Sequence, residues 1–420
     1  MKYRINSLGS LTWIVFALYL LLSVIPVYRI IETDGKHLEW PAILWLYLSV
    51  AILFGGSIFY LSAKGKLQSE PAKKLSLVLA GLFCAFYVSE IILRLSKTGT
   101  TYTEQREGFF VNPAERMTKN WYATWKPNSH RTIQSPEYNY SRFTNSEGLS
   151  DVEWNEQKDT NEIRIMALGD SFTEGDGAPF DSTYPRLLQG LLQKEFPEVK
   201  INVLNAGRAG SDPWFEFKKF NDRLLKYQPD IVLYTIGGND LFTDHLHYGG
   251  MERFVADSTV RNNIPKHAWL PLYEVSYVFR LLMNIVGYDN SLFGKDERRK
   301  NEATAIEDAR EISKQFSRLA ADYNFMCVQL LKPGKHEVKQ GDFRFNSAGL
   351  TEFKQPLPYF ETINLLSFYK DSLGINDKTV NDYYWQVDNH HNSTGYAAMA
   401  QAVLSGIQPI IIKKMPEVHP

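Results

Sequence analysis

Three long apolar windows lie within the first hundred residues. They cover 11–28, 40–63 and 75–95, and each approaches or exceeds the roughly 20 residues that span a hydrocarbon core as a helix. The first window lacks a small-x-small cleavage site and is followed by two more, so we expect a retained helix rather than a cleaved signal peptide. The pattern predicts a membrane anchor over 1–97 with three transmembrane helices.

From residue 98 to 160 the chain is polar and aromatic. We expect an irregular neck with one short strand over 140–144. Its aromatic residues are expected to pack onto the following domain rather than to bind a ligand; they are Trp121, Tyr122, Trp125 and Tyr138.

After residue 160, short β-branched runs alternate with segments of helical period. The runs are 163–168, 201–204, 231–236 and 325–331, and helical segments include 184–195 and 302–323. Continuous apolar strands between helices predict an α/β domain over 161–415, built on a parallel sheet that is covered on both faces. In such sheets ligands bind beyond the carboxyl ends of the strands. An aromatic-rich insertion over 241–300 is long enough to be a lid or a specificity element.

Charge changes this picture in two ways. The 46 Lys and Arg residues balance 47 Asp and Glu residues, which leaves no basic excess for binding nucleic acid. Positive charge precedes the first window and fills the loop between the second and third windows, at Lys2, Arg4, Lys64, Lys66, Lys73 and Lys74. These segments are expected in the cytoplasm, so three spans place the rest of the chain on the other side. We expect a multi-pass protein of the cell (inner) membrane, bound to the lipid bilayer, whose large domain is extracytoplasmic or periplasmic.

The third window contains two residues that invite a functional interpretation. Glu90 and Arg94 are one helical turn apart near its end, and we expect them to pair at the outer membrane interface rather than to form a functional site. Cys84 lies in the same window, so Cys327 has no partner and we expect no structural disulfide.

Residues suited to acyl chemistry follow three of the predicted strands. Ser171 stands in the turn 169–175, where its hydroxyl is exposed and its own N–H can meet an oxyanion. Gly207 follows the second strand and Asn239 the third. Glycine lets a backbone N–H approach a ligand, and an asparagine amide is a neutral donor for a developing negative charge. Singly, each of these is also ordinary turn chemistry.

A fourth group lies near the C-terminus, just before a helical run over 397–407. Asp388 is followed there by His390 and His391. A histidine can act as general base to the serine while the aspartate fixes its tautomer. Four such groups in this chain order predict a serine-dependent acyl-transfer site with either histidine as the base.

Together these groups resemble the four sequence blocks of the SGNH/GDSL hydrolase superfamily, over about residues 161 to 412. The resemblance implies a three-layer, flavodoxin-like fold with a central parallel sheet of about five strands and no metal or organic cofactor. It implies that Ser171 is the nucleophile and that Asp388 and a histidine complete a catalytic triad. It further implies an oxyanion hole made by the Ser171 N–H, Gly207 and Asn239.

The two histidines fit the family pattern differently. An aspartate three residues before the histidine is the commonest spacing and selects His391, whereas a spacing of two selects His390. Family members generally have a glycine five residues after the catalytic histidine, and Gly395 stands at that distance from His390. We therefore expect His390 to be the base, with Asn392 placed to cap the last helix.

A cluster beyond Asn239 contains typical metal ligands. Asp244, His245 and His247 could hold a metal. Because no matching further group of ligands is evident elsewhere, we expect a polar loop at the rim of the site and no metal.

The sequence thus predicts a membrane-anchored serine esterase that hydrolyses an O-acylated glycan or lipid of the cell envelope. Its motifs do not distinguish it from an O-acyltransferase that passes an acetyl group to an envelope polysaccharide. A third hypothesis is a noncatalytic glycan-binding component whose membrane helices contact partner membrane proteins. The complete set of nucleophile, base and oxyanion positions argues against that hypothesis.

Overall fold

The computed structural model describes most of the chain after residue 123 and a short segment before it. Described are residues 85–96 except 87 and 94, and residues 124–418 except 136, 256–259, 262 and 346–352. The chain forms two compact units, of which one combines 1–105 with 265–294 and the other combines 106–264 with 295–420. The first two apolar windows and most of the third lie outside the described residues, so the membrane anchor stays a prediction.

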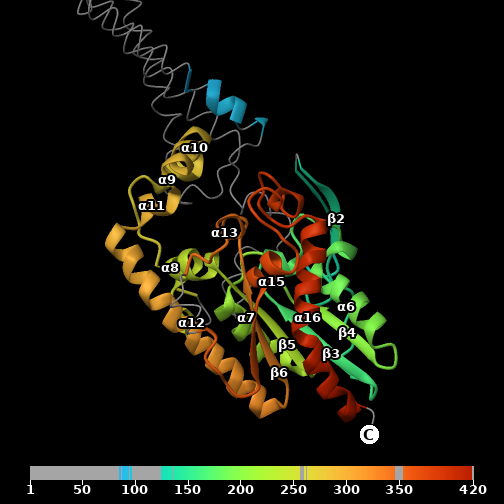
Figure 1. The fold of residues 1–420 in the computed structure, drawn as a ribbon. Coiled ribbons are helices and arrows are strands. Elements are labelled where there is room, and N and C mark those ends of the chain that lie inside the picture. The colour runs from blue at the N-terminus through green and yellow to red at the C-terminus, as the bar shows by residue number, and fades with distance from the viewer. Residues whose placement is uncertain are drawn as a thin grey trace, which may run out of the picture. The chain divides into compact units, whose positions relative to one another are not determined.

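A five-stranded parallel sheet forms the centre of the second unit (Figure 1). In spatial order its strands are β4 (Lys200–Asn205), β3 (Glu162–Leu168), β5 (Ile231–Gly237), β6 (Met326–Lys332) and β7 (Phe360–Asn364). Every residue of β3 and β5 is buried, because both strands lie inside the sheet and helices cover its faces. The parallel sheet predicted from the apolar runs is confirmed.

The edge strand β7 was not predicted from the apolar pattern. Its sequence Phe-Glu-Thr-Ile-Asn is largely polar, and only its first residue is buried. β7 pairs with β6 alone, with Phe360 opposite Cys327. A strand with a single neighbour needs no continuous apolar run, so periodicity gives little sign of it.

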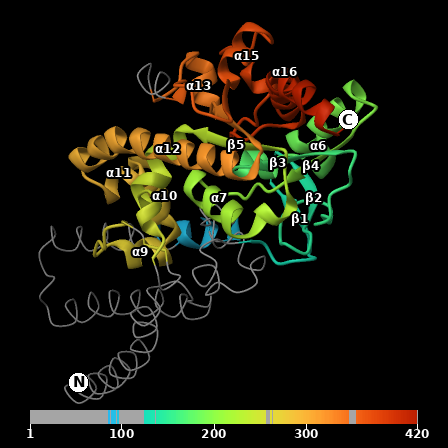
Figure 2. The same cartoon turned by 90° about the horizontal axis from the view of Figure 1, so that it is seen from below.

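Helices form a layer on each face of the sheet (Figure 2). On one face α6 (Tyr184–Glu195) packs against β4, and α16 (Ser393–Val418) packs against α6 and β3. On the other face α7 (Pro213–Lys219) contacts β5, and α12 (Lys295–Tyr323) contacts β6 and α7. Within the described part of the chain, one segment, Ser393–Met415 of α16, is long and apolar enough to cross a membrane, but its most apolar window is 56% buried. That burial fits a core helix of this domain.

The neck forms a β-hairpin in the same compact unit as the sheet. Strand β1 (His130–Gln134) pairs antiparallel with β2 (Asn139–Phe143), which overlaps the predicted short strand. Trp125 is fully buried, and its indole N–H donates to the Glu174 carboxylate at 2.6 Å. This aromatic residue packs onto the domain, as expected. Two others, Trp121 and Tyr122, lie outside the described residues.

The insertion over 241–300 is largely helical rather than an irregular loop. The part that belongs to the first unit contains α9 (Leu270–Val275), α10 (Tyr277–Val286) and α11 (Tyr288–Leu292). The helical insertion was hard to foresee because its apolar residues face outward as well as inward: Leu282 and Ile285 of α10 are exposed.

Glu90 makes contacts that its sequence position did not suggest. It is buried, and its carboxylate accepts hydrogen bonds from the Ser276 hydroxyl at 3.0 Å and from the Tyr277 and Val278 N–H groups at 2.7 and 2.9 Å. The side chain therefore caps the N-terminus of α10, where unpaired N–H groups favour a carboxylate. Its expected partner, Arg94, lies outside the described residues.

Candidate active site

Ser171 is the first residue of a short helix, α5 (Ser171–Glu174), that begins three positions after the end of β3. The preceding Asp170 caps this helix by accepting a backbone N–H at 2.9 Å. A Cβ atom at Gly169 would lie 2.0 Å from the Thr173 hydroxyl oxygen, so this tight strand-to-helix turn requires a glycine. The turn places a half-buried Ser171 at the carboxyl edge of the sheet.

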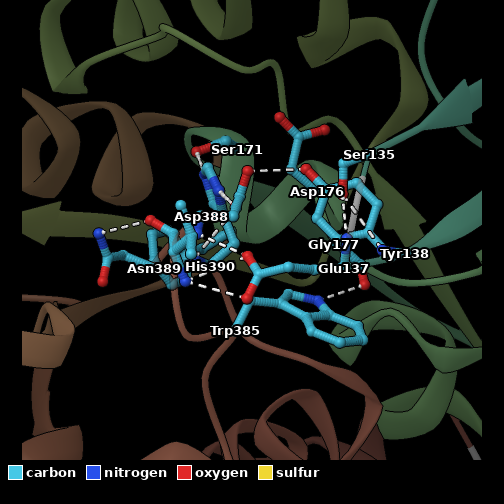
Figure 3. Close-up of polar contacts among 12 residues, drawn as sticks. Ser135, Glu137, Tyr138, Ser171, Asp176, Gly177, Trp385, Asp388, Asn389 and His390 are labelled. Atoms are coloured by element: carbon cyan, nitrogen blue, oxygen red, sulfur yellow. Dashed lines mark hydrogen bonds and ion pairs between the residues drawn. The ribbon is translucent and has the colours of Figure 1, made fainter. Parts of the chain in front are cut away.

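His390 and Asp388 reach Ser171 from the loop before α16 (Figure 3). His390 Nε2 lies 2.7 Å from Ser171 Oγ, and His390 Nδ1 is hydrogen-bonded to Asp388 Oδ1. A proton shared between Nδ1 and the aspartate leaves Nε2 of the neutral ring free to accept the serine proton. The structure thus brings Ser171 together with two side chains that can activate its hydroxyl, although 219 positions separate the serine from the histidine.

The charge states of this pair follow from their surroundings. Burial alone would raise the pKa of Asp388, but the hydrogen bond with His390 outweighs it, and the pKa is lowered. Burial alone would lower the pKa of His390, but the hydrogen bond to Asp388 and the nearby Asp176 carboxylate raise it above the usual 6.5. The aspartate is therefore ionised at neutral pH, and the histidine is a stronger base than free imidazole.

His391 has a structural environment. Its fully buried ring has Nε2 3.2 Å from the Tyr369 hydroxyl and Nδ1 3.3 Å from the Tyr383 carbonyl oxygen. Burial lowers the pKa of His391 to about 3, so its ring is neutral. A Cβ atom at Gly395 would lie 2.4 Å from His391 Nδ1, so this glycine leaves room for the ring. Asn392 caps α16 by accepting the Gly395 N–H at 3.0 Å, as expected.

The two expected oxyanion donors, Gly207 and Asn239, differ in one respect. Within the described part of the chain, one already donates a hydrogen bond to a protein group, and the other does not. The Gly207 N–H donates to Asn205 Oδ1 at 3.0 Å, and a Cβ atom at Gly207 would lie 2.3 Å from the Glu174 nitrogen. Gly207 is therefore needed for close packing against α5, and its N–H is engaged. Asn239, in the helical turn after β5, is exposed, and its amide has no hydrogen-bond partner among the described residues.

A donor that the sequence analysis missed lies three residues beyond Gly207. Gly210 is exposed and has a φ of +75°, and neither its N–H nor that of Ser171 has a partner in the part of the chain that the structure describes. The preceding Ala209 donates its N–H to Glu174 at 2.5 Å, which ties this loop to α5. The sequence signal for this donor was a second glycine in the loop after the second predicted strand.

The family of this domain follows from its motifs and this geometry together. Residues 167–350 match the model of the GDSL-like lipase/acylhydrolase family, a stretch that includes Ser171, Gly207 and Asn239. This domain belongs to the SGNH/GDSL hydrolase superfamily. Asp388 and His390 lie beyond the matched stretch, so in this SGNH domain only the fold shows their proximity to Ser171.

Several known proteins are similar to parts of the chain. A solved two-domain esterase active on acetylated mannans is 15% identical, with a TM-score of 0.37, over 59% of this chain and 49% of that one. A solved family 3 carbohydrate esterase of Clostridium thermocellum is 16% identical, with a TM-score of 0.33, over 60% of this chain and 98% of that one. An uncharacterized protein of Mycoplasma pneumoniae is 31% identical over 85 residues. That match covers 20% of this chain and 10% of the Mycoplasma protein.

Next to the Ser171 turn the SGNH domain buries a charged cluster. Lys332, the last residue of β6, has its Nζ 3.2 Å from Asp170 Oδ2 and 4.0 Å from the centre of the Phe172 ring. Asp240 is buried as well. Burial alone would lower the pKa of Lys332, but Asp170 and Asp240 outweigh it and raise the pKa. Lys332 is therefore charged, and it holds the aspartate next to Ser171. The sequence analysis missed this lysine because it follows the predicted apolar run directly.

The cluster of Asp244, His245 and His247 forms no metal site in the described part of the SGNH domain. His245 Nδ1 lies 2.6 Å from Asn301 Oδ1, and Nε2 lies 2.8 Å from Asp308 Oδ2. No group of three or more His, Cys, Asp or Glu residues among those described is arranged to hold a metal ion. Both ring nitrogens of His245 thus connect this segment to α12.

Proposed function

We propose that the chain is a serine esterase in which Ser171 is the nucleophile, His390 the general base and Asp388 the residue that orients the base. The observation that supports this most directly is the chain of two hydrogen bonds from Ser171 Oγ through the His390 ring to Asp388. In this mechanism Ser171 Oγ bonds to the ester carbonyl carbon while its proton passes to His390 Nε2. His390 then gives that proton to the departing alcohol as the bond between the carbonyl carbon and the alcohol oxygen breaks. Water next attacks the acyl carbon while His390 takes its proton, and that proton returns to Ser171 Oγ as the acid leaves.

We further propose an oxyanion hole made by the Ser171 N–H, the Asn239 amide and the Gly210 N–H. These three donors lack protein partners among the described residues, so they are available to a negatively charged oxygen without breaking a protein hydrogen bond. The Gly207 N–H is occupied by Asn205. For this reason we assign to Gly210 the donor role that the sequence resemblance gave to Gly207.

The substrate class in this proposal is an O-acylated glycan or lipid of the cell envelope. Its support is the predicted location: three apolar windows and the lysine-rich loop between the second and third predict a domain outside the cytoplasm. The same anchoring suits an O-acyltransferase, in which a glycan hydroxyl replaces water as the acceptor. Partner membrane proteins would then supply or receive the acyl group.

The test uses the full chain in lipid nanodiscs. We expect a fluorophosphonate probe to label the wild type, and p-nitrophenyl acetate to be hydrolysed. Both properties should be lost in Ser171→Ala and kept in Ser182→Ala, a control serine half-buried near the start of α6. Acetyl transfer to an added polysaccharide in preference to water would identify the transferase. A wild type that neither reacts with the probe nor turns over an ester would leave only the noncatalytic glycan-binding hypothesis.

A further inference from the structure

The turn of the neck hairpin lies against the loop that carries Asp388 (Figure 3). The Tyr138 hydroxyl donates to Asp388 Oδ2 at 2.7 Å, while Asp388 Oδ1 is bound to His390. Two partners thus hold different oxygens of one carboxylate, which restricts its rotation. Burial and the neighbouring Asp388 raise the pKa of Tyr138, so the phenol keeps the proton that it donates.

Glu137, the neighbour of Tyr138 in this turn, binds the backbone of the same loop. Its carboxylate accepts three consecutive N–H groups, of Gln386 and Asp388 at 2.8 Å and of Val387 at 2.9 Å. Burial alone would raise the pKa of Glu137, but these N–H groups outweigh it and lower the pKa. Three successive N–H groups can point at one ionised carboxylate only in a particular conformation of the loop backbone.

Lys335 and Trp385 make further contacts at the start of this loop. Lys335 Nζ donates to the carbonyl oxygens of Trp385 and Gln386 at 2.8 and 3.1 Å. The Trp385 indole N–H donates to the Gly177 carbonyl oxygen at 2.8 Å, and its ring centre lies 5.4 Å from that of Tyr138. These contacts fix the start of the loop, but the segment that leads to His390 contains the 79% exposed Val387. Within the loop the Trp385 N–H donates to the His390 carbonyl oxygen at 2.8 Å, and the hairpin binds Val387 and Asp388 from outside the loop.

We propose that Glu137 and Tyr138 are positioning residues that hold Asp388 in the orientation in which it aligns His390 with Ser171. The proposal rests on the proposed function, since positioning matters only if these three side chains react. The hairpin lies before the stretch matched by the family model, and it supports the loop of Asp388 from outside that stretch. A support of this kind lowers the number of loop conformations that compete with the reactive one.

The expected pH effect depends on the titratable groups around His390. These are Asp388 and His391 from its own loop, Asp170 and Asp176 from the turns at either end of α5, Lys332 from β6, and Glu137 and Tyr138 from the hairpin. Tyr138→Phe removes one hydrogen bond from the Asp388 carboxylate and leaves the other groups in place. The carboxylate then stabilises protonated His390 more strongly, so the pKa of His390 and the acid limb of the activity profile should rise.

The experiment measures kcat, KM and the pH profile of ester hydrolysis with the full chain and p-nitrophenyl acetate. For Tyr138→Phe we expect kcat to fall by roughly tenfold to a hundredfold, because a small misplacement of a reacting group has an effect of that size. KM should stay nearly constant, and the acid limb should move to higher pH. Glu137→Ala should reduce kcat more than Glu137→Gln, because glutamine keeps one acceptor oxygen.

Two control variants remove similar interactions away from the site. Tyr227 donates its hydroxyl to Glu147 at 3.0 Å, and Glu153 accepts the Ser146 N–H at 2.9 Å. Tyr227→Phe and Glu153→Gln should leave kcat and the acid limb unchanged. If Tyr138→Phe and Glu137→Ala behave like these controls, the positioning role is refuted while the proposed function stands. A wild type without ester turnover or probe labelling overturns both proposals.

Discussion

Among single residues, Asn239 offers the sharpest test of the oxyanion hole. Because its amide has no protein partner among the described residues, Asn239→Ala should leave the melting temperature nearly unchanged. Turnover should fall by about 10²–10³, the effect of removing one oxyanion donor, with little change in KM. Asn145 is a matched control, since its side chain accepts the Glu147 and Leu149 N–H groups. Asn145→Ala should lower stability by about 1 kcal/mol and keep turnover. The reverse pattern would remove Asn239 from the site.

The raised pKa of His390 leads to a second prediction about a single residue. In the proposed mechanism its neutral form is the base, and its pKa is raised above 6.5 mainly by Asp388 and Asp176, against the effect of burial. The kcat/KM of the wild type should therefore fall as the pH drops through a value above 6.5. Asp388→Asn removes the charge and the correct tautomer, so we expect a loss of about 10⁴ in kcat. His391→Asn should be milder, and an equally severe loss there would make His391 the base.

Among the elements, α10 depends on a residue far away in the chain. Glu90 accepts three hydrogen bonds at its N-terminus, so Glu90→Ala should destabilise this helix by about 1–2 kcal/mol, the range for losing a helix cap. Hydrogen exchange should show faster exchange of the Tyr277 and Val278 amides. Glu311→Ala on α12, which removes a half-buried glutamate that pairs with Lys314 and Arg318, is the control. Unchanged exchange at α10 would show that this helix does not need the cap.

At the scale of the whole molecule, the untested prediction is topology. A reporter inserted at Gln68, between the second and third apolar windows, should report a cytoplasmic location. A reporter fused at Pro420 should report the opposite side of the membrane. The opposite pair of results would refute the prediction from lysine and arginine counts, and with it the support for an envelope substrate.

The sequence by itself determined the type of fold and the edge of the sheet where the site lies. Its β-branched runs predicted β3, β4, β5 and β6 to within one or two residues, because buried parallel strands must be continuously apolar. Ser171 and Asn239 follow two of these runs, and the carboxyl ends of parallel strands share one edge. Half-exposed β7 and the short helices α9 to α11 left no comparable pattern.

Only the tertiary structure showed how the residues at that edge lie relative to one another. It distinguished His390, bound to Ser171, from the buried His391, although both follow Asp388 within three positions. It also showed Tyr138 bound to an aspartate 250 positions away. Local spacing cannot reveal such contacts, because they depend on how separate elements pack rather than on the period of any one element.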